Sequence, residues 1–259
     1  MQNGALGGRT FDVLLTRSPL HFLHTQLDEA AIRHPDRKSL TDYRAPAAEV
    51  HAEKDAMAAA SRIYTPHAQL ADHFGSRAWP LQWTEPPVVS LRETITRGAA
   101  VTRGAAAKDG ALFFPGPALA RNGAWEVRKV AQDLDREVWL CGETESVHFW
   151  DGITVKRLAT GAWRTAGFWN GVAAVVQPSL GESAPRVHLA ALAAGVPVIA
   201  GETCGVKARD GLTTVPFGDV EALRIAVQNV LDGPFAAVSE LIPEPMPSAV
   251  TDSRPVRNG

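Results

Sequence analysis

The sequence predicts an α/β fold, in which a mostly parallel sheet carries helices on both of its faces. From residue 111 onward, short apolar runs of strand length alternate with longer segments whose apolar residues recur at helical spacing. One run, GVAAVVQPS (171–179), is almost entirely apolar, which is typical of a parallel strand buried on both faces. This alternation predicts βαβ units and therefore a parallel sheet.

Residues 1–85 predict a smaller α/β unit ahead of that sheet. RIYTP reads as a strand, and HAQLADHFG as a short helix that ends at Gly75. In AWPLQW, Pro80 confines the expected strand to a short piece or a sheet edge. The expected strands are 11–17, 62–66 and 78–83, and the expected helices are 20–34, 44–61 and 67–75.

The composition changes between this unit and the larger one. Pro86-Pro87 interrupts the pattern, and the near-repeat TRGAAV-TRGAAA occupies residues 96–107. Small, weakly periodic segments of this kind are typical of linkers, although an arginine-bearing contact loop is an alternative. We therefore expect a linker over 86–107, a main domain over 108–233 and a proline-rich tail over 234–259.

The main domain predicts six strands and three helices. Asp219 is placed to cap the last helix, and Gly233 follows its end. The expected strands are 111–114, 137–141, 153–158, 171–179, 196–201 and 212–216, and the expected helices are 123–134, 184–195 and 219–233.

Composition and charge exclude several classes of function. A net charge of −2 gives no basic field for nucleic acid. No apolar stretch is long enough to span a membrane, and the N-terminus lacks the pattern of a signal peptide. Cys141 and Cys204 are far apart in sequence, and His21 and His24 have no apparent third ligand, so we expect a reducing cytoplasmic setting and no metal site.

The first turn of interest, FPGPALARNGAW (114–125), joins an expected strand to a helix. Gly116 and Gly123 permit close backbone approach, and Arg121 lies where the helix begins. Free N–H groups at a helix start, together with a guanidinium group, form an anion site. The spacing matches no standard nucleotide-binding motif, so a tight turn without a ligand is the alternative.

The second turn, PSLGES, follows the most apolar strand. Ser183 is a candidate N-cap for the next helix, and Pro185 is expected in its first turn. Glu182 has two interpretations: it complements the helix dipole, or it accepts hydrogen bonds from a hydroxylated ligand. Because ligands of parallel sheets bind at the carboxyl ends of strands, beside helix N-termini, we expect any ligand to bind next to these two turns.

The stretch PSLGESAPRVHLAALAAGVPVIAGETCGV, followed by DGLTTVPFGDVEAL, resembles the donor-binding core of retaining glycosyltransferases of the GT-B fold, of the family 4 or group 1 type. FPGPALARNGAWEVRKVA is similar to that family's first strand–turn–helix, and RIYTPHAQLADHFG resembles the segment that closes its N-terminal domain. The resemblance extends from about Phe114 to Asp232 and is densest over 178–223.

The resemblance implies a Rossmann-like donor domain that binds a nucleotide-sugar without a metal cofactor. Glu182 would be the catalytic-site residue that holds sugar hydroxyls. The cofactor-binding set that we assign to the donor is Gly116, Arg121, Asn122, Gly123, Ser183 and Arg186.

The sequence also departs from the family pattern. Ala190 stands where the family has a second Glu, which grips the donor ribose. Pro117 and Asn122 occupy the positions of the usual Arg and Lys, so Arg121 and Arg186 remain to meet phosphate charge. The unit ahead of the linker is about half the N-terminal, acceptor-side domain that the GT-B fold implies.

We therefore expect a glycosyltransferase that moves a sugar from a nucleotide-sugar donor to an unknown acceptor, which is a saccharide, a lipid or a small molecule. A catalytically degenerate or truncated relic, which binds a nucleotide or a protein partner, is the main alternative. Another GT-B activity, such as epimerisation of a nucleotide-sugar, is a third possibility to which no particular residue points.

Overall fold

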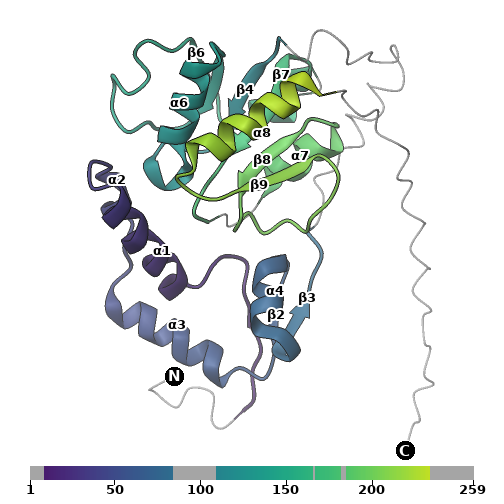
Figure 1. The fold of residues 1–259 in the computed structure, drawn as a ribbon. Helices are drawn as coiled ribbons and strands as arrows, with labels where there is room; N and C mark the ends of the chain where they lie inside the picture. Colours follow the sequence, from purple (N-terminus) through teal and green to yellow (C-terminus); the bar gives the residue numbers. More distant parts are fainter. Residues whose placement is uncertain (1–8, 84–108, 166, 182–184, 234–259) are drawn as a thin grey trace, which may run out of the picture.

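The computed structural model describes residues 9–83, 109–165, 167–181 and 185–233, which form two α/β units on separate parallel sheets (Figure 1). The expected linker over 86–107 and the expected tail over 234–259 lie outside these residues. In the part of the chain that is described, no helix is long and apolar enough to cross a membrane.

The larger unit is a six-stranded, entirely parallel sheet in the order β6-β5-β4-β7-β8-β9. Numbered by appearance within this sheet, the order is 3-2-1-4-5-6, so the direction of winding reverses between β4 and β7. All six expected strands are present: β4 (Ala111–Phe114), β5 (Val138–Cys141), β6 (Val155–Leu158), β7 (Val172–Gln177), β8 (Val198–Gly201) and β9 (Leu212–Val215).

Helices cover both faces of this sheet, as the sequence predicts. Because side chains alternate along a strand, Leu112 and Phe114 pack on one face, against α6 (Ala124–Asp133) and α8 (Val220–Asp232). Phe113 points to the other face and packs with Phe168 and with residues of α7 (Arg186–Ala193). The apolar pattern of the strands therefore builds two cores.

The expected ends of these helices are confirmed for α8 and corrected for α7. Asp219 caps α8, because its side chain accepts a hydrogen bond of 2.8 Å from the N–H of Ala222. Helix α7 begins one residue after Pro185, whose ψ of 44° is not helical, so Pro185 precedes the first turn. The expected cap, Ser183, lies outside the described residues.

The smaller unit has three parallel strands in the order β1-β2-β3, and β3 is an edge strand, as Pro80 predicts. Leu15, Met57, Ile63 and Leu70 form its core. The short helix α2 is not expected from the sequence. The elements are β1 (Val13–Leu14), α1 (Leu20–Arg33), α2 (Ser39–Asp42), α3 (Ala47–Ala59), β2 (Ile63–Thr65), α4 (Ala68–Phe74) and β3 (Ala78–Pro80).

A first contact region joins α1 and α2 to the larger unit, below α6 in Figure 1. Leu27 and Leu40 pack with Ala120 and Leu180 in a shared apolar cluster. Beside it, the guanidinium group of Arg37 pairs with the carboxylate of Glu126, and both side chains are buried. The two units are therefore joined by apolar packing around a buried ion pair.

A second contact region joins the start of α4 to the loop that follows β8. The indole N–H of Trp83 donates a hydrogen bond of 3.0 Å to the carbonyl of Gly205, and the rings of Trp83 and His67 meet edge to face. Gly205 has a φ of +78°, and a Cβ atom there would lie 2.1 Å from Nδ1 of His67. Only glycine suits this position, because of both its backbone and its neighbour.

The buried ion pair predicts a distinct pattern of stability. The single substitution Arg37→Met leaves the carboxylate of Glu126 buried without its cation, so we expect a loss of about 3–5 kcal/mol in the free energy of unfolding. The double substitution Arg37→Met/Glu126→Leu removes both charges and should cost much less. Urea unfolding measures both values, and an equal or larger loss in the double variant would contradict the assignment.

The close approach at Gly205 predicts a second effect. Gly205→Ala should lower the free energy of unfolding by about 1–3 kcal/mol more than Gly152→Ala, because only the first change drives a methyl group into His67. Gly152 is the matched control, since its φ is +83° and no atom lies within 4 Å of an added Cβ. Thermal unfolding of the two variants checks the difference, and equal losses would refute it.

Candidate functional site

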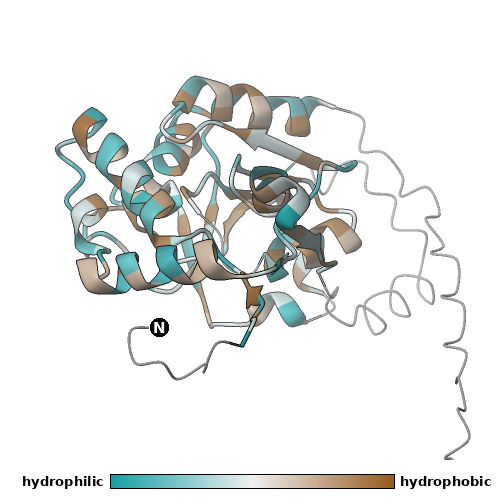
Figure 2. Cartoon of the chain, turned by 90° about the horizontal axis from the view of Figure 1, so that it is seen from below, coloured by the Kyte–Doolittle hydropathy of each residue, from teal (hydrophilic) through white to brown (hydrophobic). Residues whose placement is uncertain are grey.

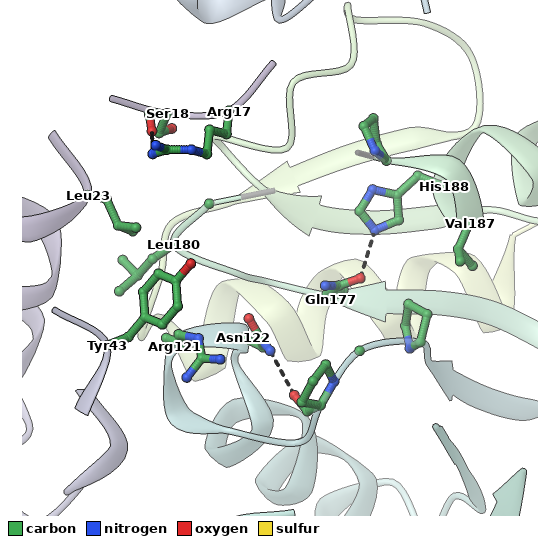
Figure 3. Close-up of a pocket in the computed structure, with 15 residues that line it drawn as sticks. Arg17, Ser18, Leu23, Tyr43, Arg121, Asn122, Gln177, Leu180, Val187 and His188 are labelled. Atoms are coloured by element: carbon green, nitrogen blue, oxygen red, sulfur yellow. Dashed lines mark hydrogen bonds between the residues drawn. The ribbon is translucent and has the colours of Figure 1, made fainter. Parts of the chain in front are cut away.

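A cavity of about 370 Å³ lies where the winding of the larger sheet reverses. Its walls come from the turn after β4, from the end of β7 and the first turn of α7, and from α1, α2 and the turn after β1 in the smaller unit. Open parallel sheets bind ligands at this kind of position, outside the carboxyl ends of the strands. The cavity is therefore the main candidate for a functional site (Figure 3).

The turns that follow β4 and β7 are held together by a hydrogen bond and by close packing. The N–H of Leu180 donates a hydrogen bond of 2.9 Å to the carbonyl of Arg121. Gly123, with a φ of +84°, lies so close to the second turn that a Cβ atom there would be 2.5 Å from Cγ of Pro178. The backbone at Arg121 is therefore held against the end of β7.

Arg121 is presented to the cavity by a 3-10 turn, Ala120–Asn122, that precedes α6. Its guanidinium group lies over the ring of Tyr43, 4.6 Å from the ring centroid. The neighbouring Asn122 is oriented by a hydrogen bond of 2.8 Å from its side-chain amide to the carbonyl of Pro117 (Figure 3). The cation is thus partly buried and positioned by a residue of the smaller unit.

The described part of the cavity wall is positively charged. Arg17 and Arg121 line it, and no Asp or Glu is present among its described residues. Arg17 also pairs with Glu53 at 2.9 Å, so part of its charge is already compensated. Arg121 has no such carboxylate partner among the ion pairs of the described residues. The wall therefore favours an anionic ligand, chiefly through Arg121.

Two buried polar side chains add neutral contacts to the wall. Gln177 ends β7, and its side-chain oxygen lies 3.2 Å from Nε2 of His188 on α7 (Figure 3). Both residues line the cavity and are almost completely buried. Their contact joins the end of the central strand to the first turn of α7.

The structure assembles part of the site that the sequence predicts. Gly116, Arg121 and Asn122 line the cavity. Gly123 is absent from its lining and serves instead to let the two turns approach.

Other predicted residues stand apart from the cavity. Arg186 is exposed and does not belong to the described lining. Glu182 and Ser183 lie outside the described residues, so their assigned roles remain predictions.

The start of α6 differs from the expected anion-binding helix mouth. The N–H of Ala120 donates to the side chains of Ser39 and Glu145, and the N–H of Gly123 donates 2.9 Å to the carbonyl of Ala120. These donors are satisfied by protein groups, of which only Ser39 belongs to α2, and at the first residue of α6 the N–H of Ala124 donates 3.3 Å to the carbonyl of Leu119. The first turn of α7, with Val187 and His188, is the helix start that reaches the cavity.

Several lining residues were not predicted from the sequence. Arg17 and Ser18 lie in the turn after β1, so the rule that ligands bind after parallel strands could have identified them. Gln177 could have been identified as the polar residue at the end of an otherwise apolar strand. Tyr43 carried no signal, because only the packing of the smaller unit brings it to Arg121.

Comparison with known proteins finds a family to which the larger unit is similar. A family model described as "Glycosyl transferases group 1" matches residues 124–233. A search of curated proteins finds no match.

Solved structures are similar over both units. Sucrose-phosphate synthase from Thermosynechococcus elongatus superposes with a TM-score of 0.52 and 17% identity, over 75% of this chain and 56% of that one. The lipopolysaccharide outer core galactosyltransferase WaaB gives 0.49 and 14%, over 69% and 55%. AviGT4, a glycosyltransferase involved in avilamycin A biosynthesis, gives 0.44 and 18%, over 64% and 53%. The match therefore covers little more than half the length of each of these proteins.

The similarity to the synthase is at the level of the fold, and the family match is confined to the larger unit. Both agree with the parallel sheet whose winding reverses between β4 and β7. Over residues 124–233 the larger unit is similar to the group 1 glycosyltransferases, and the chain shares the α/β, Rossmann-like fold of the synthase.

Proposed function

We propose that this chain takes part in the transfer of a sugar from a nucleotide-sugar donor to an acceptor, and that the cavity between β4 and β7 holds the diphosphate of the donor. The observation that carries this proposal is that Arg121 and the first turn of α7 line the same cavity. The described wall of this cavity contains no carboxylate. A diphosphate needs this combination of a cation and hydrogen-bond donors.

The proposed chemistry is stabilisation of the departing nucleoside diphosphate. Negative charge builds on the diphosphate oxygens as the glycosidic bond breaks, so donors placed in advance lower the barrier. Arg121 would supply a bidentate guanidinium group, and Arg17 a second cation on the side of the smaller unit. Glu182 is proposed to hold sugar hydroxyls, and retention of the anomeric configuration is proposed from the family. The proposal requires no metal cofactor and places the reaction in the cytoplasm.

A degenerate domain that only binds a nucleotide is the second candidate. The position of the family's second Glu is occupied by Ala190, which is 1% exposed and packs in the apolar core beneath α7. No carboxylate therefore grips a ribose from this position, and the N–H of Ala120 ahead of α6 already donates to Ser39 and Glu145. Both features favour weaker donor binding than a family member with the full pattern would have.

Donor binding is tested by calorimetry with UDP, GDP and ADP and with their sugar conjugates, in buffer containing EDTA. We expect at least one nucleotide to bind, and we expect Arg121→Ala to weaken it by about 10- to 100-fold, because an arginine–phosphate contact contributes about 1.5–3 kcal/mol. Arg157→Ala, which removes an exposed arginine on β6, is the matched control and should change nothing.

Different outcomes separate the two candidates. Sugar transfer to an acceptor panel, with the product's anomeric proton followed by NMR, supports the enzyme, whereas tight binding without turnover supports the degenerate domain. The absence of binding by every nucleotide, or equal affinity in the Arg121→Ala variant, would contradict the proposed donor site. Binding that appears only when EDTA is replaced by Mg²⁺ would contradict the metal-independent part.

A further inference from the structure

A side chain of the smaller unit touches the cation on which the proposed donor site depends. The guanidinium group of Arg121 lies over the ring of Tyr43, and Figure 3 shows the two side chains together in the wall of the cavity. Tyr43 directly follows α2, whereas Arg121 belongs to the turn before α6, so this contact joins the two units. The attraction between a guanidinium group and an aromatic ring changes an equilibrium constant by about 3- to 30-fold, and the effect is largest where water is excluded.

The chain just before Tyr43 is anchored beside Arg121. The hydroxyl of Ser39, at the start of α2, accepts a hydrogen bond of 3.0 Å from the N–H of Ala120, the residue before Arg121. Leu40 is completely buried in the apolar cluster that also contains Ala120. Figure 2 shows hydrophilic and hydrophobic residues mixed along the helices, as expected of helices that bury one side. Helix α2 therefore places the residue that follows it, Tyr43, next to Arg121.

The chain just after Tyr43 is anchored to α1. A guanidinium N–H of Arg44 donates a hydrogen bond of 2.7 Å to the carboxylate of Asp28, and the N–H of Ala45 donates one of 3.1 Å to Nε2 of His24. Tyr43 thus lies between two anchored stretches, although the residue is 50% exposed. Its half-exposed ring is held in the wall of the cavity by the backbone on either side of it.

A neutral partner suits this cation better than a carboxylate would. A carboxylate would orient Arg121 equally well, but it would also offset the charge that attracts a phosphate. A tyrosine ring carries no net charge, and it covers only one face of the planar guanidinium group. The five N–H donors point outward from the edge of that plane, so the stacked group is still able to donate two parallel hydrogen bonds to phosphate oxygens.

We propose that Tyr43 is a positioning residue for donor binding: its ring holds the guanidinium group of Arg121 in the orientation that a diphosphate requires. Docking of the smaller unit then raises the affinity of the larger unit for the donor. This inference rests on the proposed function, because it takes Arg121 as the cation that binds the diphosphate. It goes beyond that function by giving a residue of the smaller unit a part in donor binding.

Calorimetric titration of the full chain tests the inference, with whichever of UDP, GDP and ADP binds most tightly. We expect Tyr43→Leu to weaken binding by about 3- to 30-fold, and Tyr43→Phe to keep the original affinity, because the ring remains. Trp79→Leu is the matched control and should change nothing. The guanidinium group of Arg62 lies 4.5 Å from the ring centroid of Trp79, a contact of the same kind, but neither residue belongs to the described lining of the cavity.

Two results of this titration would overturn the inference. Unchanged affinity in Tyr43→Leu would show that the ring does not influence the cation. An equal loss in Tyr43→Phe would show that the hydroxyl group, and not the ring, makes the contribution.

A double-mutant cycle separates positioning from an independent effect on the cavity. If the ring acts through the guanidinium group, Tyr43→Leu should have no further effect on nucleotide affinity once Arg121 has been replaced by alanine. The same loss in the presence and in the absence of the Arg121 side chain would overturn the inference, because the ring would then act on the ligand by another route.

NMR of the arginine side chains examines the stack without any nucleotide. A proton held over an aromatic ring is shifted upfield by the ring current. The Nε–H resonance of Arg121 should therefore move downfield in Tyr43→Leu and stay in place in Tyr43→Phe. The Nε–H of Arg62 should respond only to Trp79→Leu. An Arg121 resonance that does not respond to Tyr43→Leu would overturn the inference.

The inference and the proposed function fail in different ways. If a nucleotide binds and Arg121→Ala weakens it, while Tyr43→Leu has no effect, the positioning role is overturned and the donor site stands. If no nucleotide binds, the proposed function is overturned and the positioning role with it, even where NMR confirms the stack.

Discussion

The contact between the turns after β4 and β7 is the constraint on which the site depends. Where the strand order of a parallel sheet reverses, the turns that follow the two neighbouring strands lie side by side. Here the hydrogen bond from the N–H of Leu180 to the carbonyl of Arg121, and the packing of Gly123 on Pro178, fix these two turns in place. Arg121 lies on this hydrogen-bonded stretch of backbone. Its guanidinium group is therefore held in the part of the cavity wall that the turns of the sheet form. The smaller unit then packs on this same pair of turns, through Ala120 and Leu180.

The smaller unit therefore acts on the site as well as on stability. Ser39 of its helix α2 accepts a hydrogen bond from the N–H of Ala120 ahead of α6, its Tyr43 lies against Arg121, and its residue Ser18 lines the cavity. The larger unit alone would lack these walls. The contacts that join the units, among them the buried Arg37–Glu126 pair, thus also shape the wall of the cavity.

The sequence predicts the larger sheet well, because its inner strands β4, β7 and β8 are buried on both faces and read as uninterrupted apolar runs. It predicts Gly116, Arg121 and Asn122 as cavity residues, because they follow a strand and precede a helix. It does not predict that Ser39 of α2 bonds to Ala120, or that Tyr43 meets Arg121, because these contacts join residues about 80 positions apart and depend on how the units dock.

The central claim is that a diphosphate is held between Arg121 and the first turn of α7. A crystal structure of the chain with a bound nucleoside diphosphate tests it most directly. The account predicts phosphate oxygens within hydrogen-bond distance of the Arg121 guanidinium group and of the α7 backbone at Val187 and His188. Phosphates bound elsewhere, with Arg121 still lying over Tyr43 and touching no ligand, would contradict it.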